Sequence, residues 1–172
     1  YFAIGAERMS KSLNLGNLMR SAHGFGASFT FTIGATYHAL EAAADTSKGA
    51  QHLPHYNWAK LDDMALPEGC KLVGVELLDD AVDLPSFRHP LRAAYVLGPE
   101  RGSLSPELIA RCDWTIKIPT SFCINVAMAG AIVMYDRVRS LGRFAPRPLL
   151  EGGPTEALED HTWGKPIVRS KD

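Results

Sequence analysis

The sequence has 172 residues, of which 46% are hydrophobic and 22% are charged, and its formal net charge at pH 7 is -1. These values are typical of one compact globular domain with a substantial core, and they exclude a wholly disordered chain. Most stand-alone nucleic-acid-binding domains are clearly basic, so any RNA contact made by this chain must be local.

Membrane and metal signals are missing from the sequence. No apolar run approaches the roughly 18 residues of a membrane-spanning helix, and the first residues lack the pattern of a signal peptide. The three cysteines never form a C-x-x-C pair, which favours reduced thiols. His52 and His55 have a plausible ligand spacing, but no third ligand accompanies them. We therefore expect a cytoplasmic protein that needs neither a membrane nor a metal.

Apolar runs and helical patterns alternate from the start of the chain. Strands are predicted over residues 1–4 and 28–33, with a helix between them that begins near Asn14. Asn14 suits the N-cap of this helix, and Gly24-Phe25-Gly26 ends it. Two further helical patterns follow, over residues 39–44 and 46–50.

The second half of the chain continues the alternation. Strands are predicted over residues 71–77, 93–97 and 114–118. Ser105-Pro106-Glu107 is typical of a helix start, with a capping hydroxyl, an early proline and an early acid. This order predicts an α/β fold, with a mainly parallel sheet, helices on both faces and ligands at the carboxyl ends of the strands.

The last predicted helix, residues 124–141, is apolar on every side over much of its length. Such a helix must be buried all round, which in a chain of this size needs threading through the core or a second subunit. After Phe144 the sequence changes to proline, glycine and then acidic residues. We therefore predict a domain over residues 1–144 and a tail over residues 145–172.

Three polar segments interrupt the core pattern: NLGNLMRSA at residues 14–22, LGPERGSL at 97–104 and IPTSFCINV at 118–126. The glycines of the second segment follow a strand, where an α/β fold brings its backbone close to small molecules. Each polar residue also has a plain structural interpretation. Asn14 and Asn125 fit helix caps, Arg20 a surface cation, and Glu100 an exposed turn acid.

In this order the three segments resemble the three motifs of the SpoU (TrmH) family of SPOUT methyltransferases. The family motifs are N-x-G-N-x-x-R-[ST]-A, G-P-E-x-x-G-L and, after I-P and a loop, S-[LM]-N-[VL]. The resemblance covers residues 1 to about 144. It implies a deep C-terminal trefoil knot in the α/β fold, an S-adenosylmethionine site in the knotted loops, an obligate homodimer, and 2′-O-methylation of transfer or ribosomal RNA.

The resemblance also assigns roles to residues. The residues expected in the catalytic cleft are Asn14, Arg20, Glu100 and Asn125. The residues expected to contact the cofactor are Leu77, Gly98, Gly102, Ile118 and Cys123. In two respects the chain departs from the family: Cys123 stands where the third motif has serine, and the loop before Asn125 is short. Ser121 is an alternative source of the missing hydroxyl.

Methyl transfer from a sulfonium to a hydroxyl is an in-line displacement. Arg20 is a poor proton acceptor because a guanidinium stays protonated at neutral pH. We expect Arg20 to hold a phosphate and to stabilise negative charge on the 2′-oxygen, while a phosphate oxygen or water takes the proton.

Three other functions stay open. A base methyltransferase of the same superfamily would differ in its RNA pocket. A non-catalytic RNA-binding or assembly factor is suggested by Cys123 and by the near-neutral charge. A dinucleotide-binding oxidoreductase fits only the α/β pattern, because G-x-G-x-x-G does not follow the first strand.

Overall fold

A seven-stranded parallel sheet forms the centre of the computed structural model, which describes residues 1–35, 52–142, 144, 147 and 152. The strands are β1 (Phe2–Glu7), β2 (Phe29–Ile33), β3 (His55–Trp58), β4 (Lys71–Val75), β5 (Val82–Asp83), β6 (Ala93–Leu97) and β7 (Trp114–Lys117). Their order across the sheet is β3-β2-β1-β6-β4-β7-β5, and every neighbouring pair is parallel. The predicted mainly parallel α/β sheet is confirmed.

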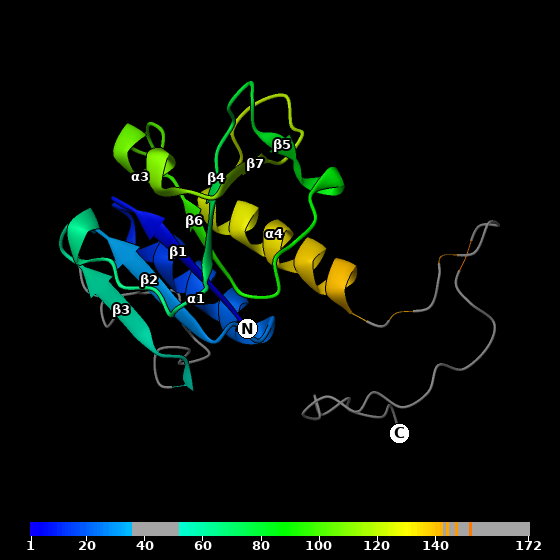
Figure 1. Cartoon of the computed structure of the whole chain (residues 1–172), viewed down its shortest axis with the longest axis horizontal. Coiled ribbons are helices and arrows are strands. Elements are labelled where there is room, and N and C mark those ends of the chain that lie inside the picture. The colour runs from blue at the N-terminus through cyan, green and yellow to red at the C-terminus, as the bar shows by residue number, and fades with distance from the viewer. Residues whose placement is uncertain (36–51, 143, 145–146, 148–151, 153–172) are drawn as a thin grey trace. The chain divides into compact units, whose positions relative to one another are not determined.

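Helices cover both faces of this sheet (Figure 1). On one face, α1 (Ser12–Gly24) and α4 (Val126–Leu141) pack over the first hydrophobic cluster, with the short η3 (Leu84–Ser86) beside α4. On the other face, α3 (Pro106–Arg111) and the single turn η2 (Leu61–Asp63) cover the second cluster. Since β1, β2 and β6 are buried along their whole length, their continuous apolar runs match a sheet that is covered twice.

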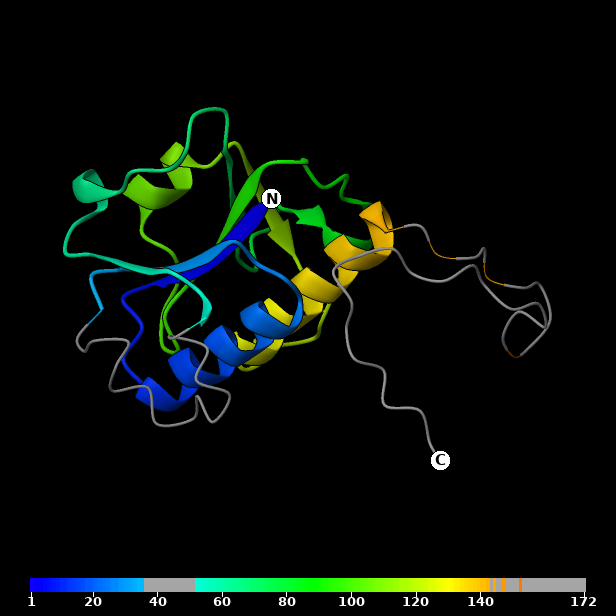
Figure 2. The ribbon, with the colours of Figure 1, turned by 90° about the horizontal axis from the view of Figure 1, so that it is seen from below.

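The two longest helices among the described residues, α1 and α4, lie side by side (Figure 2). Gly130 permits this close packing, because a Cβ atom at its position would lie 2.4 Å from Cδ1 of the buried Leu18. The pairing brings the start of α4 next to the start of α1. Two of the three polar segments therefore meet at one end of the helix pair.

The start of α1 differs from the prediction. The helix begins at Ser12 with Lys11 as its N-cap, so Asn14 lies in the first turn and is not the cap. The N-cap prediction is wrong because the Asn14 side chain bonds two distant residues instead of its own helix. The strands β3 and β5 were not predicted. The helical patterns over residues 39–44 and 46–50 lie outside the described residues.

The last helix is buried on one face of this chain and exposed on the other. Val126, Ala127, Val133 and Met134 are buried, whereas Met128 is 59% exposed and Tyr135 is 57% exposed. The single chain therefore buries only one face of the helix, and of the two predicted ways to bury the rest, a second subunit would cover the exposed face. No helix among the described residues is long and apolar enough to cross a membrane. Of the predicted tail over residues 145–172, only Arg147 and Gly152 are described.

Candidate active site

A cleft of about 380 Å³ opens at the carboxyl ends of the central strands. It is lined from four parts of the chain, namely the start of α1, the end of β4, the loop after β6, and the segment that leads from β7 into α4. The lining residues are Lys11, Asn14, Val75, Glu76, Leu77, Leu97, Gly98, Pro99, Glu100, Gly102, Ile118, Thr120, Cys123, Ile124, Asn125, Val126 and Ala129. All of the residues expected at the site lie in this lining except Arg20.

Asn14 connects the other two polar segments. Its Nδ2 donates a hydrogen bond of 3.0 Å to Oε1 of Glu100, and its Oδ1 accepts one of 3.0 Å from Nδ2 of Asn125. These partners are 86 and 111 residues away along the chain. We call the hydrogen-bonded chain of Glu100, Asn14 and Asn125 the polar bridge. It joins the three polar segments.

Asn125 has its orientation fixed by the helix that it begins. Its Oδ1 accepts hydrogen bonds from the backbone N–H groups of Ala127, at 2.9 Å, and Met128, at 3.3 Å. The interpretation of Asn125 as a helix cap is therefore confirmed. Because the oxygen is taken up by the cap, the amide nitrogen is the group that faces Asn14.

Glu100 accepts hydrogen bonds on both oxygens. Oε2 accepts from the backbone N–H of Ser10 at 2.9 Å and from its hydroxyl at 3.0 Å, while Oε1 accepts from the N–H of Lys11 and from Asn14, each at 3.0 Å. Partial burial raises the pKa of Glu100, but the hydrogen bonds from Ser10 and Asn14 outweigh it, so the pKa lies below its ordinary value. The side chain therefore serves as a carboxylate that holds the α1 start against the loop.

Arg20 lies outside the cleft of its own chain. It is an exposed residue of α1 and is absent from the lining. Six residues of helix place it about 9 Å along the axis from Asn14 and on another side of the helix. Its expected catalytic role stays a prediction.

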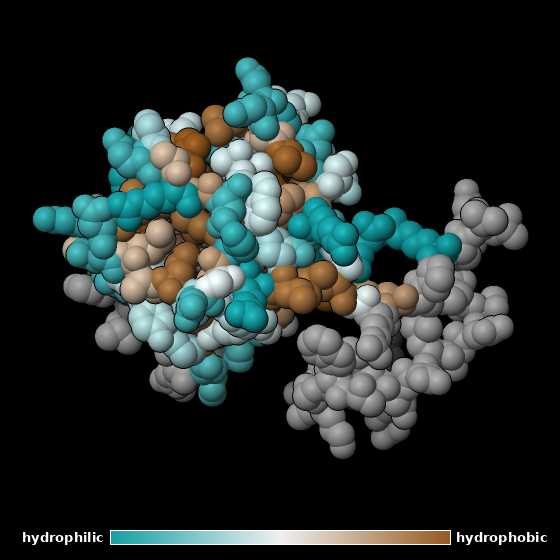
Figure 3. Space-filling model, viewed as in Figure 1, coloured by the Kyte–Doolittle hydropathy of each residue, from teal (hydrophilic) through white to brown (hydrophobic). Residues whose placement is uncertain are grey.

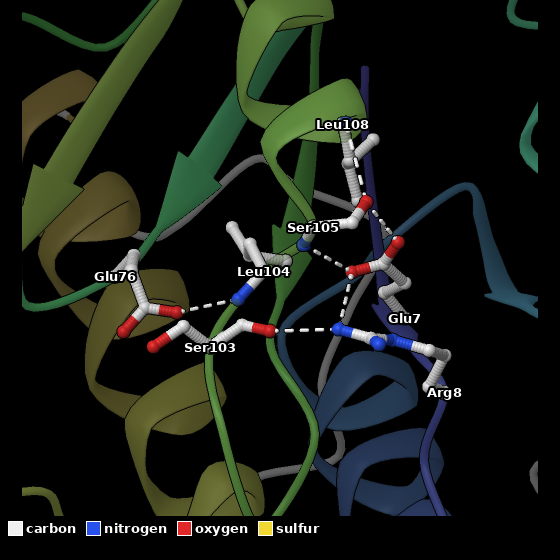
Figure 4. A network of polar contacts seen from close by, with 7 residues as sticks. All are labelled: Glu7, Arg8, Glu76, Ser103, Leu104, Ser105 and Leu108. Carbon is white, nitrogen blue, oxygen red and sulfur yellow. Dashed lines mark hydrogen bonds and ion pairs between the residues drawn. The ribbon is translucent and has the colours of Figure 1, made fainter.

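The loop after β6 is fixed between two acidic residues (Figure 4). On one side, the buried Glu7 at the end of β1 accepts hydrogen bonds from the backbone N–H, at 2.7 Å, and from the hydroxyl of Ser105. Arg8 extends from the same strand end, and its guanidinium donates to the carbonyl of Ser103 at 2.9 Å. On the other side, Oε2 of Glu76 accepts from the N–H of Leu104 at 2.8 Å.

Two glycines of this loop have distinct reasons to be glycine. A Cβ at Gly98 would lie 3.1 Å from Oε2 of Glu76, so Gly98 leaves room for that carboxylate. Gly102 adopts a φ of +102°, which side chains disfavour. Counted from Gly98, the glycine of the second family motif falls on Ser103, so Gly102 lies one position earlier than the motif requires.

Ser121, the alternative source of the hydroxyl expected from the third motif, is exposed and absent from the lining, so its role stays a prediction. Cys123 does line the cleft and is exposed. Thr120, which the sequence did not suggest, also lines it, and its hydroxyl donates to the carbonyl of Phe122 at 2.9 Å.

Glu76 and Lys11 are the charged residues of the lining that sequence reasoning missed. The available signal for Glu76 was an acidic residue near the end of the predicted strand over residues 71–77, at the ligand-binding edge of a parallel sheet; the strand itself ends earlier, at Val75. The cleft volume lies within the roughly 300–1,000 Å³ that small-molecule sites occupy. In the part of the chain that the structure describes, no three His, Cys, Asp or Glu side chains are placed to hold a metal ion.

The sequence is similar to those of known RNA methyltransferases. The sequence model of the SpoU rRNA Methylase family matches residues 1–135. The chain is 26% identical over 150 residues to the mouse tRNA (guanosine(18)-2′-O)-methyltransferase TARBP1. The aligned residues make up 79% of this chain and 9% of that protein. It is 31% identical over 134 residues to a Staphylococcus haemolyticus protein named as a TrmH family tRNA/rRNA methyltransferase, covering 73% of this chain and 53% of the relative.

Solved structures share the fold. An rRNA methyltransferase from Sinorhizobium meliloti superimposes with a TM-score of 0.72 at 24% identity, over 81% of this chain and 56% of that one. An AdoMet-bound rRNA methyltransferase from the same organism superimposes equally well, with a TM-score of 0.72. The present chain spans about half the length of this structure and of the bacterial relative, and a small part of the mouse protein. With the family match extending over 135 residues from Tyr1, the chain belongs to the SpoU rRNA methylase family.

Proposed function

We propose that this chain is an S-adenosylmethionine-dependent methyltransferase that acts on the ribose 2′-hydroxyl of transfer or ribosomal RNA. The observation that supports this most is the hydrogen-bonded chain from Glu100 through Asn14 to Asn125 at the edge of one cleft. The named activities of the mouse and bacterial relatives agree with it.

The cleft has the chemistry that S-adenosylmethionine requires. Leu77, Leu97 and Ile118 give it apolar walls for an adenine ring, and Gly98 lets the backbone approach closely. Cys123 and Gly102 complete the set that we assign to the cofactor. When bound, the cofactor supplies a methyl group attached to a positively charged sulfur. An oxygen nucleophile takes this methyl group by displacing the sulfur.

The protein's own part in the reaction is alignment and charge stabilisation. Good alignment of two reacting groups can supply roughly 7 to 11 kcal/mol of the barrier. We assign this task to the polar bridge, because Glu100 and the α4 cap hold its amides in fixed orientations. Arg20 binds the adjacent phosphate and stabilises charge on the 2′-oxygen, and a phosphate oxygen or water accepts the proton.

We further propose that the chain works as a homodimer. Large apolar side chains of α1 and α4 are exposed in the single chain, among them Leu13 at 57%, Met128 at 59% and Tyr135 at 57%. An apolar face of this kind is usually covered by a partner. Light scattering after size-exclusion chromatography tests it, and a monomer at micromolar concentration would contradict it.

We also infer a knotted backbone near the C-terminus and a cytoplasmic location. The knot is supported by the path from β7, on the far side of β4, to the start of α4 beside α1. Tracing the backbone in an experimental electron-density map tests it. The cytoplasmic location is supported by the free thiols of Cys70, Cys112 and Cys123.

The activity is tested by incubating the protein with transfer or ribosomal RNA and isotope-labelled S-adenosylmethionine, then digesting the RNA and separating nucleosides by mass spectrometry. We expect the label on ribose. Label on a base would support the base methyltransferase, and RNA binding without S-adenosylmethionine binding would support the assembly factor. RNA from deletion and parent cells, compared in the same way, identifies the modified nucleotide.

A further inference from the structure

Two carboxylates line the cleft, and they differ in their capacity for further hydrogen bonds. A carboxylate can accept about four hydrogen bonds. Both oxygens of Glu100 already accept two each, from Ser10, Lys11 and Asn14. Glu76 accepts only one on each oxygen among the described residues, from Leu77 and Leu104. Glu76 is thus the carboxylate with acceptor sites left for a ligand.

The position of Glu76 is fixed on both sides. Oε1 accepts from the backbone N–H of Leu77 at 3.0 Å, and Oε2 accepts from the N–H of Leu104 at 2.8 Å. Gly98 packs against it without a side chain, since a Cβ there would lie 3.1 Å from Oε2. Figure 4 shows the carboxylate turned toward the loop backbone at Leu104, with Glu7 on the opposite side of the loop. A charge held in this way needs no rearrangement when a ligand enters.

The charged side chains of the lining are one lysine and two glutamates, Lys11, Glu76 and Glu100. The cleft therefore carries a net negative charge. S-adenosylmethionine carries a net positive charge at neutral pH because of its sulfonium, and the product, S-adenosylhomocysteine, carries none. The methyl donor therefore carries one positive charge more than the product, and the negative cleft attracts the donor more strongly.

We propose that Glu76 is a specificity residue whose negative charge favours the cationic methyl donor over its neutral product. This inference rests on the proposed function. In methyl transfer the carbon–sulfur bond would break with its electrons passing to sulfur, and the 2′-oxygen would bond to the methyl carbon. The hydroxyl proton would pass to a phosphate oxygen or water, so the ligand would lose its positive charge. The attraction to Glu76 then weakens, which promotes release of the product.

Calorimetric titration of the full chain with S-adenosylmethionine and with S-adenosylhomocysteine tests this. We expect Glu76→Gln to weaken binding of the donor about tenfold and binding of the product about threefold or less. Glu76→Asp keeps the charge but is one methylene shorter, so both affinities should fall by a similar factor. Asp79→Asn, an equal charge change at an exposed residue outside the lining, should leave both affinities unchanged.

A measurement on the unaltered chain tests the proposal even if a variant does not fold. The ratio of donor affinity to product affinity should fall as salt rises from 50 mM to 500 mM, because salt screens the attraction between charges. If Glu76→Gln lost affinity for donor and product by the same factor, or if the ratio of the two affinities did not depend on salt, the proposed role of Glu76 would be refuted. The proposed function of the chain would not be affected by either result. If the unaltered chain bound neither ligand, the proposed function would fail and this inference with it.

Discussion

Replacing Glu100 with glutamine removes one acceptor from the polar bridge. The carboxylate receives backbone N–H groups on both oxygens, that of Ser10 on one and that of Lys11 on the other. Glutamine has one oxygen and one NH₂ group. In either orientation its NH₂ group is placed against a backbone N–H, so at least one charge-assisted hydrogen bond is lost and replaced by repulsion.

The expected cost follows from these contacts. A hydrogen bond to a charged group contributes about 1.5 to 3 kcal/mol, and water can replace part of it because these donors are exposed. We expect the free energy of unfolding to fall by about 1 to 2 kcal/mol, which lowers the melting temperature by about 3 to 6 °C. Urea unfolding followed by circular dichroism measures it, with Glu68→Gln at an exposed site as the matched control.

The pH dependence gives a second test of the same contacts. Because folding lowers the pKa of Glu100, its contribution to stability is full above the ordinary glutamate pKa of about 4.3 and is lost as pH falls through the lowered value. The stability difference between the unaltered chain and Glu100→Gln should therefore be full at pH 7 and shrink at pH 3. Equal stability at pH 7, or a difference that does not change with pH, would refute this reasoning.

Other changes have equally definite outcomes. Gly98→Ala should weaken S-adenosylmethionine binding in calorimetry and cost about 1 kcal/mol of stability, because its Cβ would crowd Glu76. Gly24→Ala, in α1 and with no atom within 4 Å, should leave binding unchanged and should not lower stability, because a helix favours alanine over glycine. Arg137→Leu should lower the free energy of unfolding in urea by about 3 kcal/mol, because the buried guanidinium bonds the carbonyls of Pro90 and Leu91; the exposed Arg139→Leu should be neutral. Burial lowers the pKa of His55 to about 4, so stability should fall as pH drops from about 6.5 to 4, and melting curves of His55→Gln should lack that part of the fall.

Local signals predicted some elements well. The range of β6 matches the predicted strand over residues 93–97, because a short apolar run is bounded by polar residues. The start of α3 follows its cap, since the Ser105 hydroxyl accepts from the N–H of Leu108 and Pro106 opens the first turn. In both cases the information lies within a few neighbouring residues. Elements of this kind can be predicted from one sequence.

The strands β3 and β5 carry no such signal. His55-Tyr56-Asn57-Trp58 alternates weakly and lies in an edge strand, and β5 has two residues. Such short strands form because a neighbouring strand supplies hydrogen bonds, and that depends on the rest of the sheet. Their own side chains do not determine them.

In the polar site, too, some features could be predicted from the sequence, while others depend on residues far away along the chain. The motifs predicted that the segments of Asn14, Glu100 and Asn125 belong to one site, and the structure places the three side chains in one hydrogen-bonded chain. The local cap rule misplaced the start of α1 because a partner 86 residues away outweighs it. The contact between Glu76 and Leu104, 28 residues apart, has no spacing signal at all.

We propose that the methyl donor binds in the cleft between Glu76, the loop after β6 and the start of α4. A crystal structure of the chain grown with S-adenosylmethionine tests it most directly. We expect density for the ligand against Leu77, Gly98 and Ile118, with its methyl group facing the side of the cleft that holds Asn14. Ligand density on another surface, or none in this cleft at saturating concentration, would show that the donor site lies elsewhere.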